Sequence, residues 1–92
     1  MKSFNLSITT PDKTLYDGKV SSLVAPSKIG YLGVLADHAP LIAVLGPGRI
    51  MLREDSGGEK VFNSEGSGLL EIMKNSVTIL LSDHPLQLGQ KQ

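Results

Sequence analysis

The 92-residue sequence contains no cysteine and no tryptophan. The absence of cysteine excludes disulfide bonds, thiolate zinc sites and thiol catalysis, and it fits a cytosolic protein. Aromatic residues make up only 4% of the chain, which is too few for a surface that stacks nucleic-acid bases. Nine basic and nine acidic residues give a net charge of zero, so the basic surface typical of a nucleic-acid binder is missing as well.

Long hydrophobic runs are also lacking. The first ten residues alternate between apolar and polar side chains, unlike a signal peptide, and no later run is long enough to cross a bilayer. Hydrophobic residues still make up 40% of the chain and charged residues 20%, a balance typical of a protein that folds around a core. We expect a single domain over residues 1–85 and a frayed tail over residues 86–92.

The sequence does contain a succession of strand patterns. Phe4, Leu6 and Ile8 alternate with polar residues, which indicates a half-buried strand. Similar runs follow about every ten residues and are separated by glycine, proline and Asp-Gly signals. No window shows the periodicity of an amphipathic helix. The pattern predicts an all-β fold, namely a small β-sandwich of about eight to ten short, mostly antiparallel strands.

Two segments carry more specific expectations. Asp17-Gly18 is typical of a tight hairpin turn, which would separate a short strand ending at Tyr16 from a strand over residues 19–25. The apolar run over residues 41–45 is too short for a helix and indicates a strand that is buried on both faces.

The neighbouring Asp37 and His38 raise the question of catalysis. Adjacent residues of an extended chain point to opposite faces, so Asp37 is poorly placed to orient His38, and no Gly-x-Ser-x-Gly nucleophile motif occurs. A metal site would have to combine His38 and His84 with scattered carboxylates, and the glycines carry no nucleotide-binding signature. We therefore favour a binding or structural module without catalytic residues, cofactor or metal. An enzyme built on Asp37, His38 and Glu71 and a small ligand-enclosing β-barrel remain as alternatives.

A series of short motifs between about Phe4 and Asp83 adds to this interpretation. In order, the motifs are Thr10-Pro11, Leu15-Tyr16-Asp17-Gly18, Gly30-x-x-Gly33-Val34-Leu35, His38-Ala39-Pro40-Leu41, Leu45-x-Pro47-Gly48-x-Ile50, Gly68-x-Leu70-Glu71-Ile72 and Asn75-x-Val77-Thr78-Ile79-Leu80. No single motif is diagnostic, but the ordered set resembles the N-terminal β-sandwich of the epsilon subunit of the rotary F-type ATP synthase.

The resemblance implies a mechanical function. In that family the sandwich is a non-catalytic rotor part of the central stalk. It clamps the gamma subunit to the membrane-embedded c-ring, so that ion transport is coupled through rotation to ATP synthesis. The positions that match the family's contacts are Lys28, Ile29, Gly30 and Tyr31 for the polar loops of the c-ring, and Thr10, His38 and Ala43 for gamma. The implied location is peripheral, at the cytoplasmic face of the bacterial inner membrane or its equivalent. A generic β-sandwich binding module is the alternative function.

The sequence departs from the family in three places. Ala36-Asp37 replaces the usual Pro-Gly, and a positive φ retained at Asp37 would cost about 1 kcal/mol. Leu32 replaces a phenylalanine. Family members also continue into two C-terminal helices that inhibit ATP hydrolysis, whereas this sequence ends at Gln92. We expect those helices and their activities to be absent.

Overall fold

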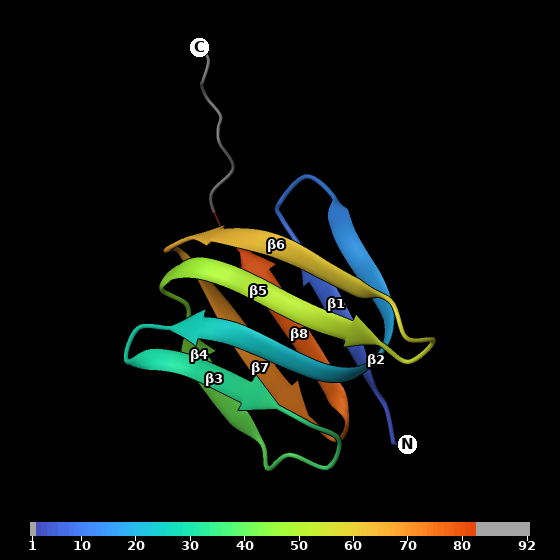
Figure 1. The fold of residues 1–92 in the computed structure, drawn as a ribbon. Coiled ribbons are helices and arrows are strands. Elements are labelled where there is room, and N and C mark those ends of the chain that lie inside the picture. Colours follow the sequence, from blue (N-terminus) through green and yellow to red (C-terminus); the bar gives the residue numbers. More distant parts are fainter. Residues whose placement is uncertain (1, 83–92) are drawn as a thin grey trace.

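A computed structural model describes residues 2–82 of the protein, and this part of the chain is built from strands (Figure 1). In chain order the strands are β1 (Phe4–Thr9), β2 (Thr14–Ser27), β3 (Gly30–Val34), β4 (Leu41–Val44), β5 (Pro47–Glu54), β6 (Glu59–Glu65), β7 (Gly68–Met73) and β8 (Ser76–Leu81). The predicted all-β fold and its number of strands are confirmed. The predicted tail over residues 86–92 lies outside the described residues.

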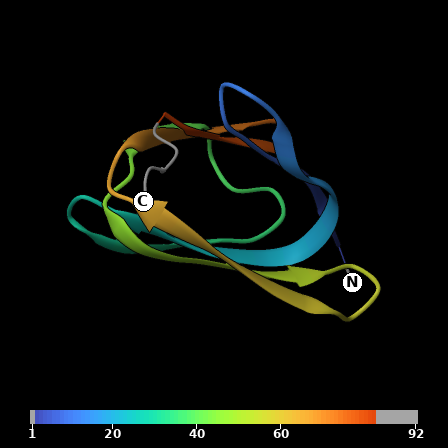
Figure 2. The same cartoon turned by 90° about the horizontal axis from the view of Figure 1, so that it is seen from above.

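The eight strands form one hydrogen-bonded sheet that folds over into two layers. The strand order is β4-β7-β8-β1-β2-β5-β6, and β3 pairs with β2. The described strand pairs are antiparallel, apart from the parallel pair of β1 and β8. Figure 2 shows β1, β4, β7 and β8 in one layer and β3, β5 and β6 in the other. The long β2 belongs to both layers, because its first half pairs with β1 and its second half with β3 and β5.

The core lies between these layers and is made by the inward face of each strand. Phe4, Leu6 and Ile8 are buried, as the alternating pattern of β1 predicts. On the neighbouring β8, the buried side chains are Val77, Ile79 and Leu81, again two residues apart. Each aliphatic side chain removed from water in this way stabilises the fold by about 1.5–3 kcal/mol.

The turn predicted at Asp17-Gly18 is wrong. Both residues lie inside β2 and pair with Ser7 and Leu6 of β1, and neither has a positive φ. Glycine is suited to this position for another reason, since a Cβ atom on Gly18 would lie 2.9 Å from the hydroxyl oxygen of Tyr16. The glycine therefore makes room for a side chain that packs along the strand.

The strand predicted over residues 41–45 is present as β4, but its predicted burial on both faces is wrong. Ile42 and Val44 are 67% and 50% exposed, whereas Leu41 and Ala43 on the opposite side are half-buried. The physical reason is that the fold has two layers, so one side of β4 faces the core and the described strands place no further layer over its other side. An apolar strand face therefore meets solvent.

Candidate interaction surface

The residues predicted to meet the c-ring lie together at the β2–β3 hairpin. Lys28 and Ile29 form its two-residue tip, between the paired Ser27 and Gly30. The Ser27 hydroxyl accepts a hydrogen bond from the Ile29 N–H at 3.3 Å and donates one to the Gly30 carbonyl at 2.5 Å. Gly30 has a φ of 134°, a conformation that favours glycine. Ile29 is 99% exposed, so this tip presents an aliphatic side chain almost entirely to solvent.

Tyr31 belongs to the same hairpin, but its hydroxyl group is engaged within the fold. The backbone N–H of Arg49 in β5 donates a hydrogen bond to the Tyr31 hydroxyl oxygen at 3.2 Å. A Cβ atom on Gly48 would lie 2.6 Å from that oxygen. The Tyr31 side chain therefore reaches from β3 across β2 to β5, and the residue stays 59% exposed to solvent.

A groove of about 430 Å³ lies between the hairpin tip and β4. Apolar side chains line both sides of it, with Ile29 and Leu32 on the hairpin and Leu41, Ile42, Ala43 and Val44 on β4. The Lys28 N–H donates a hydrogen bond to the Val44 carbonyl at 3.1 Å, which ties the two sides together. The groove thus brings Ala43, a predicted gamma contact, next to the predicted c-ring contacts Lys28 and Ile29.

The residues predicted to face gamma do not form one cluster. Thr10 directly follows β1, in a loop at the opposite end of the molecule from the β3–β4 loop that carries His38 (Figure 1). Ala43 lies on the core-facing side of β4, and its cross-strand partner is the buried Leu70 of β7. Thr10 and His38 therefore lie in loops at opposite ends of the layer of β1, β4, β7 and β8, whereas Ala43 lies within this layer.

The outer side of that layer carries exposed hydrophobic residues that sequence analysis missed. Leu80 pairs with Leu69, and Leu69 pairs with Val44, so these three side chains share one side of the sheet. Ile42 and Met73 lie an even number of residues from Val44 and Leu69 and so face the same way. We call these five residues, all of which are exposed, the apolar face.

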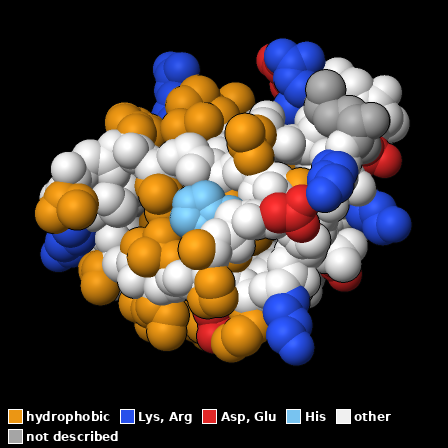
Figure 3. Space-filling view, turned by 90° about the horizontal axis from the view of Figure 1, so that it is seen from below, with side chains coloured by type: hydrophobic (Ala, Val, Ile, Leu, Met, Phe, Trp, Pro, Cys, Tyr) orange, Lys and Arg blue, Asp and Glu red, His pale blue; other side chains and the backbone are white. Residues whose placement is uncertain are grey.

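A signal for the apolar face was present in the sequence. Hydrophobic residues stand at adjacent positions in Leu69-Leu70, Ile72-Met73 and Ile79-Leu80-Leu81, where strict alternation would place a polar residue beside each of them. When one side of such a strand faces the core, the remaining hydrophobic residues must lie on the other side. The end of the molecule near the β3–β4 loop is apolar as well, since hydrophobic side chains predominate over one half of the view in Figure 3.

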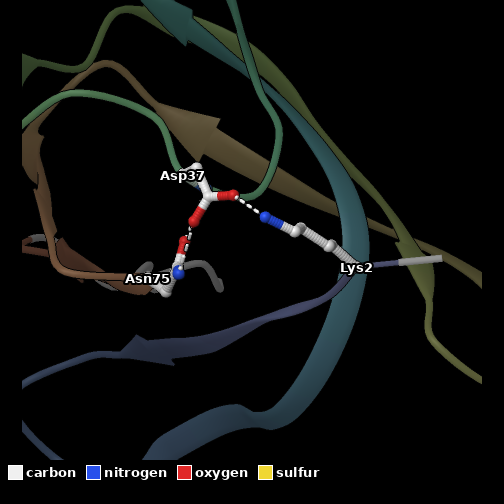
Figure 4. Close-up of polar contacts among 3 residues, drawn as sticks. All are labelled: Lys2, Asp37 and Asn75. Carbon is white, nitrogen blue, oxygen red and sulfur yellow. Dashed lines mark hydrogen bonds and ion pairs between the residues drawn. The ribbon is translucent and has the colours of Figure 1, made fainter.

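Asp37 fixes the loop that carries His38 (Figure 4). Its N–H donates a hydrogen bond to Oδ1 of Asn75 at 2.5 Å, and the Asn75 amide donates back to Asp37 Oδ1 at 2.9 Å. Lys2 Nζ lies 2.5 Å from Asp37 Oδ2. The hydrogen bonds from Lys2 and Asn75 lower the pKa of the Asp37 carboxyl group, and the contact with Asp37 raises the pKa of Lys2. Asp37 has a φ of 66°, in agreement with the family's glycine at this position.

Asp37 and His38 do not form an acid–base pair. The Asp37 carboxylate contacts Lys2 and Asn75, while Nδ1 of His38 lies 2.7 Å from the Ala39 carbonyl oxygen, to which its N–H can donate. Between residues 2 and 82, no three His, Cys, Asp or Glu side chains are grouped so that they could hold a metal ion. His84 lies outside this range. The same range contains no helical segment with the length and apolarity needed to span a bilayer.

Comparisons with known proteins identify relatives over most of the chain. The family model of the ATP synthase delta/epsilon chain β-sandwich domain matches residues 3–84. The ATP synthase epsilon chain of Leptospira borgpetersenii is 46% identical over 81 residues, which are 87% of this chain and 61% of the relative. The epsilon chain of Dichelobacter nodosus is 41% identical over 95% of this chain and 59% of its own length. The chain thus spans about three-fifths of these relatives, although it covers 92% of the Chlorobium limicola epsilon chain at 37% identity.

Two solved structures share the fold. A chain of the Euglena gracilis mitochondrial ATP synthase, in a structure of OSCP, F1 and c-ring, has a TM-score of 0.80 at 22% identity and is matched over 88% of this chain and 51% of its own. A chain of the Tetrahymena thermophila mitochondrial ATP synthase central stalk and c-ring has a TM-score of 0.71 at 22% identity, with coverages of 89% and 65%. Together with the family model and the identities above, the fold shows that the chain belongs to the ATP synthase delta/epsilon chain β-sandwich family.

Proposed function

We propose that this protein is an epsilon-type, non-catalytic rotor subunit of an F-type ATP synthase, which clamps the gamma subunit to the c-ring. The proposal draws on relatives named ATP synthase epsilon chain and on structural neighbours solved in ATP synthase assemblies that include the c-ring. In this role the protein needs no cofactor of its own. It is held at the cytoplasmic face of the membrane through the complex, and rotation of the clamped parts couples ion transport to ATP synthesis.

The apolar face is the main support for the proposed contact with gamma. Large apolar patches on a soluble protein mark sites of interaction, and here five hydrophobic residues lie on one side of a sheet with no layer over them. Of the positions that match the gamma contacts of the family, Thr10 and His38 lie in loops at the two ends of the same layer, whereas Ala43 is on the core-facing side of β4 and does not belong to the apolar face. We assign gamma to this side of the molecule.

The hairpin tip is assigned to the c-ring. Ile29 is nearly free of contacts with its own fold, as its exposure shows, and Lys28 beside it adds a positive charge. The two-residue turn presents both side chains at the end of a hairpin, where a partner can reach them. This contact and the gamma contact meet at the groove between the hairpin and β4, so one small domain can touch both partners.

The gamma contact is tested by gel filtration of this protein with the gamma subunit of the same organism. We expect co-elution at a one-to-one ratio, and we expect Ile42→Lys to weaken the affinity at least about tenfold, because it places a charge in a desolvated contact. Val61→Lys is the matched control. Val61 is an exposed hydrophobic residue of β6 in the other layer, and its substitution should leave binding unchanged. Co-elution of the Ile42→Lys variant at wild-type affinity would exclude the apolar face as the gamma contact, and failure of the wild-type protein to bind would favour a generic binding module.

The c-ring contact is tested separately with purified c-ring in detergent and the complex of this protein with gamma. Ile29→Ser removes an exposed side chain and should leave the free energy of unfolding unchanged within about 0.5 kcal/mol. We expect it to reduce attachment to the ring while binding to gamma is retained. Unchanged attachment would exclude the hairpin tip as the contact.

A further inference from the structure

We infer that Tyr31 is a positioning residue, which braces the β2–β3 hairpin against β5 and so directs the Ile29 tip, instead of contacting the c-ring itself. The inference rests on the proposed function for the identity of the partner. The brace is a property of the isolated protein and can be measured without the ring.

The first observation is where the β2–β5 ladder ends. Its last pair is Val24 with Met51, and two residues further along β2 stands Pro26, which has no N–H to donate. The Pro26 carbonyl accepts a hydrogen bond from Gly46 at 2.8 Å. Beyond the ladder, the Arg49 N–H of β5 donates to the side chain of Tyr31 at 3.2 Å. The phenol hydroxyl thus continues the attachment of the hairpin to β5 where the backbone ladder has stopped.

The second observation is the space that the fold leaves for the Tyr31 ring. Tyr31 is the cross-strand partner of Pro26, so both side chains lie on the same side of the sheet. A Cβ atom on Gly48 would lie 2.6 Å from the Tyr31 hydroxyl oxygen and 3.0 Å from Cβ of Pro26. Pro26 is buried although it stands next to the last residue of β2. The ring therefore passes over β2 to a position that only a glycine at residue 48 leaves open.

The hairpin is attached to the rest of the fold on two sides. On one side, the Lys28 N–H and the Pro26 carbonyl bond to the backbone of Val44 and Gly46. On the other side, Tyr31 reaches β5. An ordered tip loses less conformational entropy when it docks than a mobile tip does, which favours binding. Tyr31 can therefore increase affinity for a partner that touches only Lys28 and Ile29.

The experiment compares Tyr31→Phe with the wild-type protein, first in isolation. Phenylalanine keeps the ring and removes the hydroxyl acceptor. We expect the Arg49 amide to exchange its hydrogen on the order of five-fold faster, and the NMR order parameters of the Lys28 and Ile29 amides to fall. Tyr16→Phe is the matched control, since the Tyr16 hydroxyl donates to Glu54 at 2.9 Å away from the hairpin. It should leave the Arg49 amide and the hairpin order unchanged.

The second part measures attachment of the gamma complex to purified c-ring. We expect Tyr31→Phe to weaken attachment several-fold and Ile29→Ser to weaken it further. Unchanged Arg49 exchange and unchanged hairpin order in Tyr31→Phe would overturn the brace, whatever the ring measurement shows. If Tyr31→Phe loosens the hairpin but Ile29→Ser attaches normally, the brace stands and the proposed contact between hairpin and ring is wrong.

Discussion

Gly68 shows at the residue scale how one neighbouring backbone can restrict a position to a single amino acid. It begins β7, and a Cβ atom there would collide with the carbonyl oxygen of Leu80 and lie 3.3 Å from Cα of Leu81. Because both obstacles are backbone atoms of the paired β8, a rotamer change cannot relieve the collision.

We predict that Gly68→Ala lowers the free energy of unfolding by about 2 kcal/mol, because β7 and β8 must separate to admit the methyl group. Urea denaturation monitored by circular dichroism gives this value. Gly33→Ala is the control, since a Cβ atom on Gly33 would meet no atom within 4 Å and its φ is not positive. Equal losses in the two variants would show that the collision does not cause the effect, because alanine fits at residue 33 without strain.

Asp37 makes stability depend on pH. Its pKa is lowered in the fold by Lys2 and Asn75, so the carboxylate stabilises the protein at a pH above its unfolded value of about 3.9. The contribution is lost as the pH falls through the lower folded pKa. We predict that Asp37→Asn, which keeps an acceptor for Asn75 and tolerates a positive φ, loses less stability between pH 5 and pH 2 than the wild-type protein. The measurement is the free energy of unfolding across this range, and parallel curves for the two proteins would contradict the assignment.

At the scale of an element, the turn of the β7–β8 hairpin also depends on which residues tolerate a positive φ. Lys74 and Asn75 form its turn with φ values of 50° and 59°, and two successive positive values define the type I′ turn that suits the twist of paired strands. Asparagine fits such positions well, whereas lysine at the first position must adopt a conformation that its side chain disfavours.

We predict that Lys74→Asn stabilises the hairpin by about 0.5 kcal/mol and raises the melting temperature by a few degrees. Differential scanning calorimetry would measure both. Lys60→Asn removes the same charge from an exposed position inside β6, where asparagine is disfavoured, and should not stabilise. A gain in both variants would point to the loss of charge as the cause.

Local patterns predicted the elements well and their surroundings less well. The strand β1 could be predicted because its alternation depends on a few neighbouring residues. The turn predicted at Asp17-Gly18 was wrong because this dipeptide also occurs inside strands. In β2, Gly18 makes room for the side chain of Tyr16. The burial of β4 could not be predicted, because it depends on whether another layer covers Ile42 and Val44, which is decided by strand order over the whole chain.

At the scale of the whole molecule, charge balance and the apolar face act together. The chain has no net charge at pH 7 and a sequence pI of about 6.7, so electrostatic repulsion between copies is weakest near neutral pH. In the isolated protein, the apolar face is then open to other copies of the same chain.

We predict that self-association of the isolated protein is strongest near its pI and decreases toward pH 9, as measured by static light scattering at several concentrations. Ile42→Lys should reduce association more than Val61→Lys does. The two substitutions change the net charge equally, so an equal effect would show that net charge alone controls association and that the apolar face does not contribute.

The candidate contacts illustrate what sequence could reveal at this scale. Family resemblance implied a c-ring contact for residues 28–31, and this contact stays a prediction. The structure places Lys28 and Ile29 of this set on one exposed turn. The role of Tyr31 toward Arg49 was hidden, because residues 18 positions apart meet only through the pairing of β3, β2 and β5. The apolar face was hidden for the same reason, since Val44, Leu69 and Leu80 become neighbours only across three strands.

The parallel pairing of β1 with β8 has a consequence for how the protein is made. The first strand lies between β2 and β8 in the sheet, so one of its two edges stays without its partner until the ribosome has synthesised the last strand. A nascent chain that stops before Ser76 exposes that edge together with the half-finished core, and such edges pair readily with other chains. The two edges of β1 can both be paired only after residue 81 has left the exit tunnel, so the sandwich cannot close strand by strand from its N-terminus.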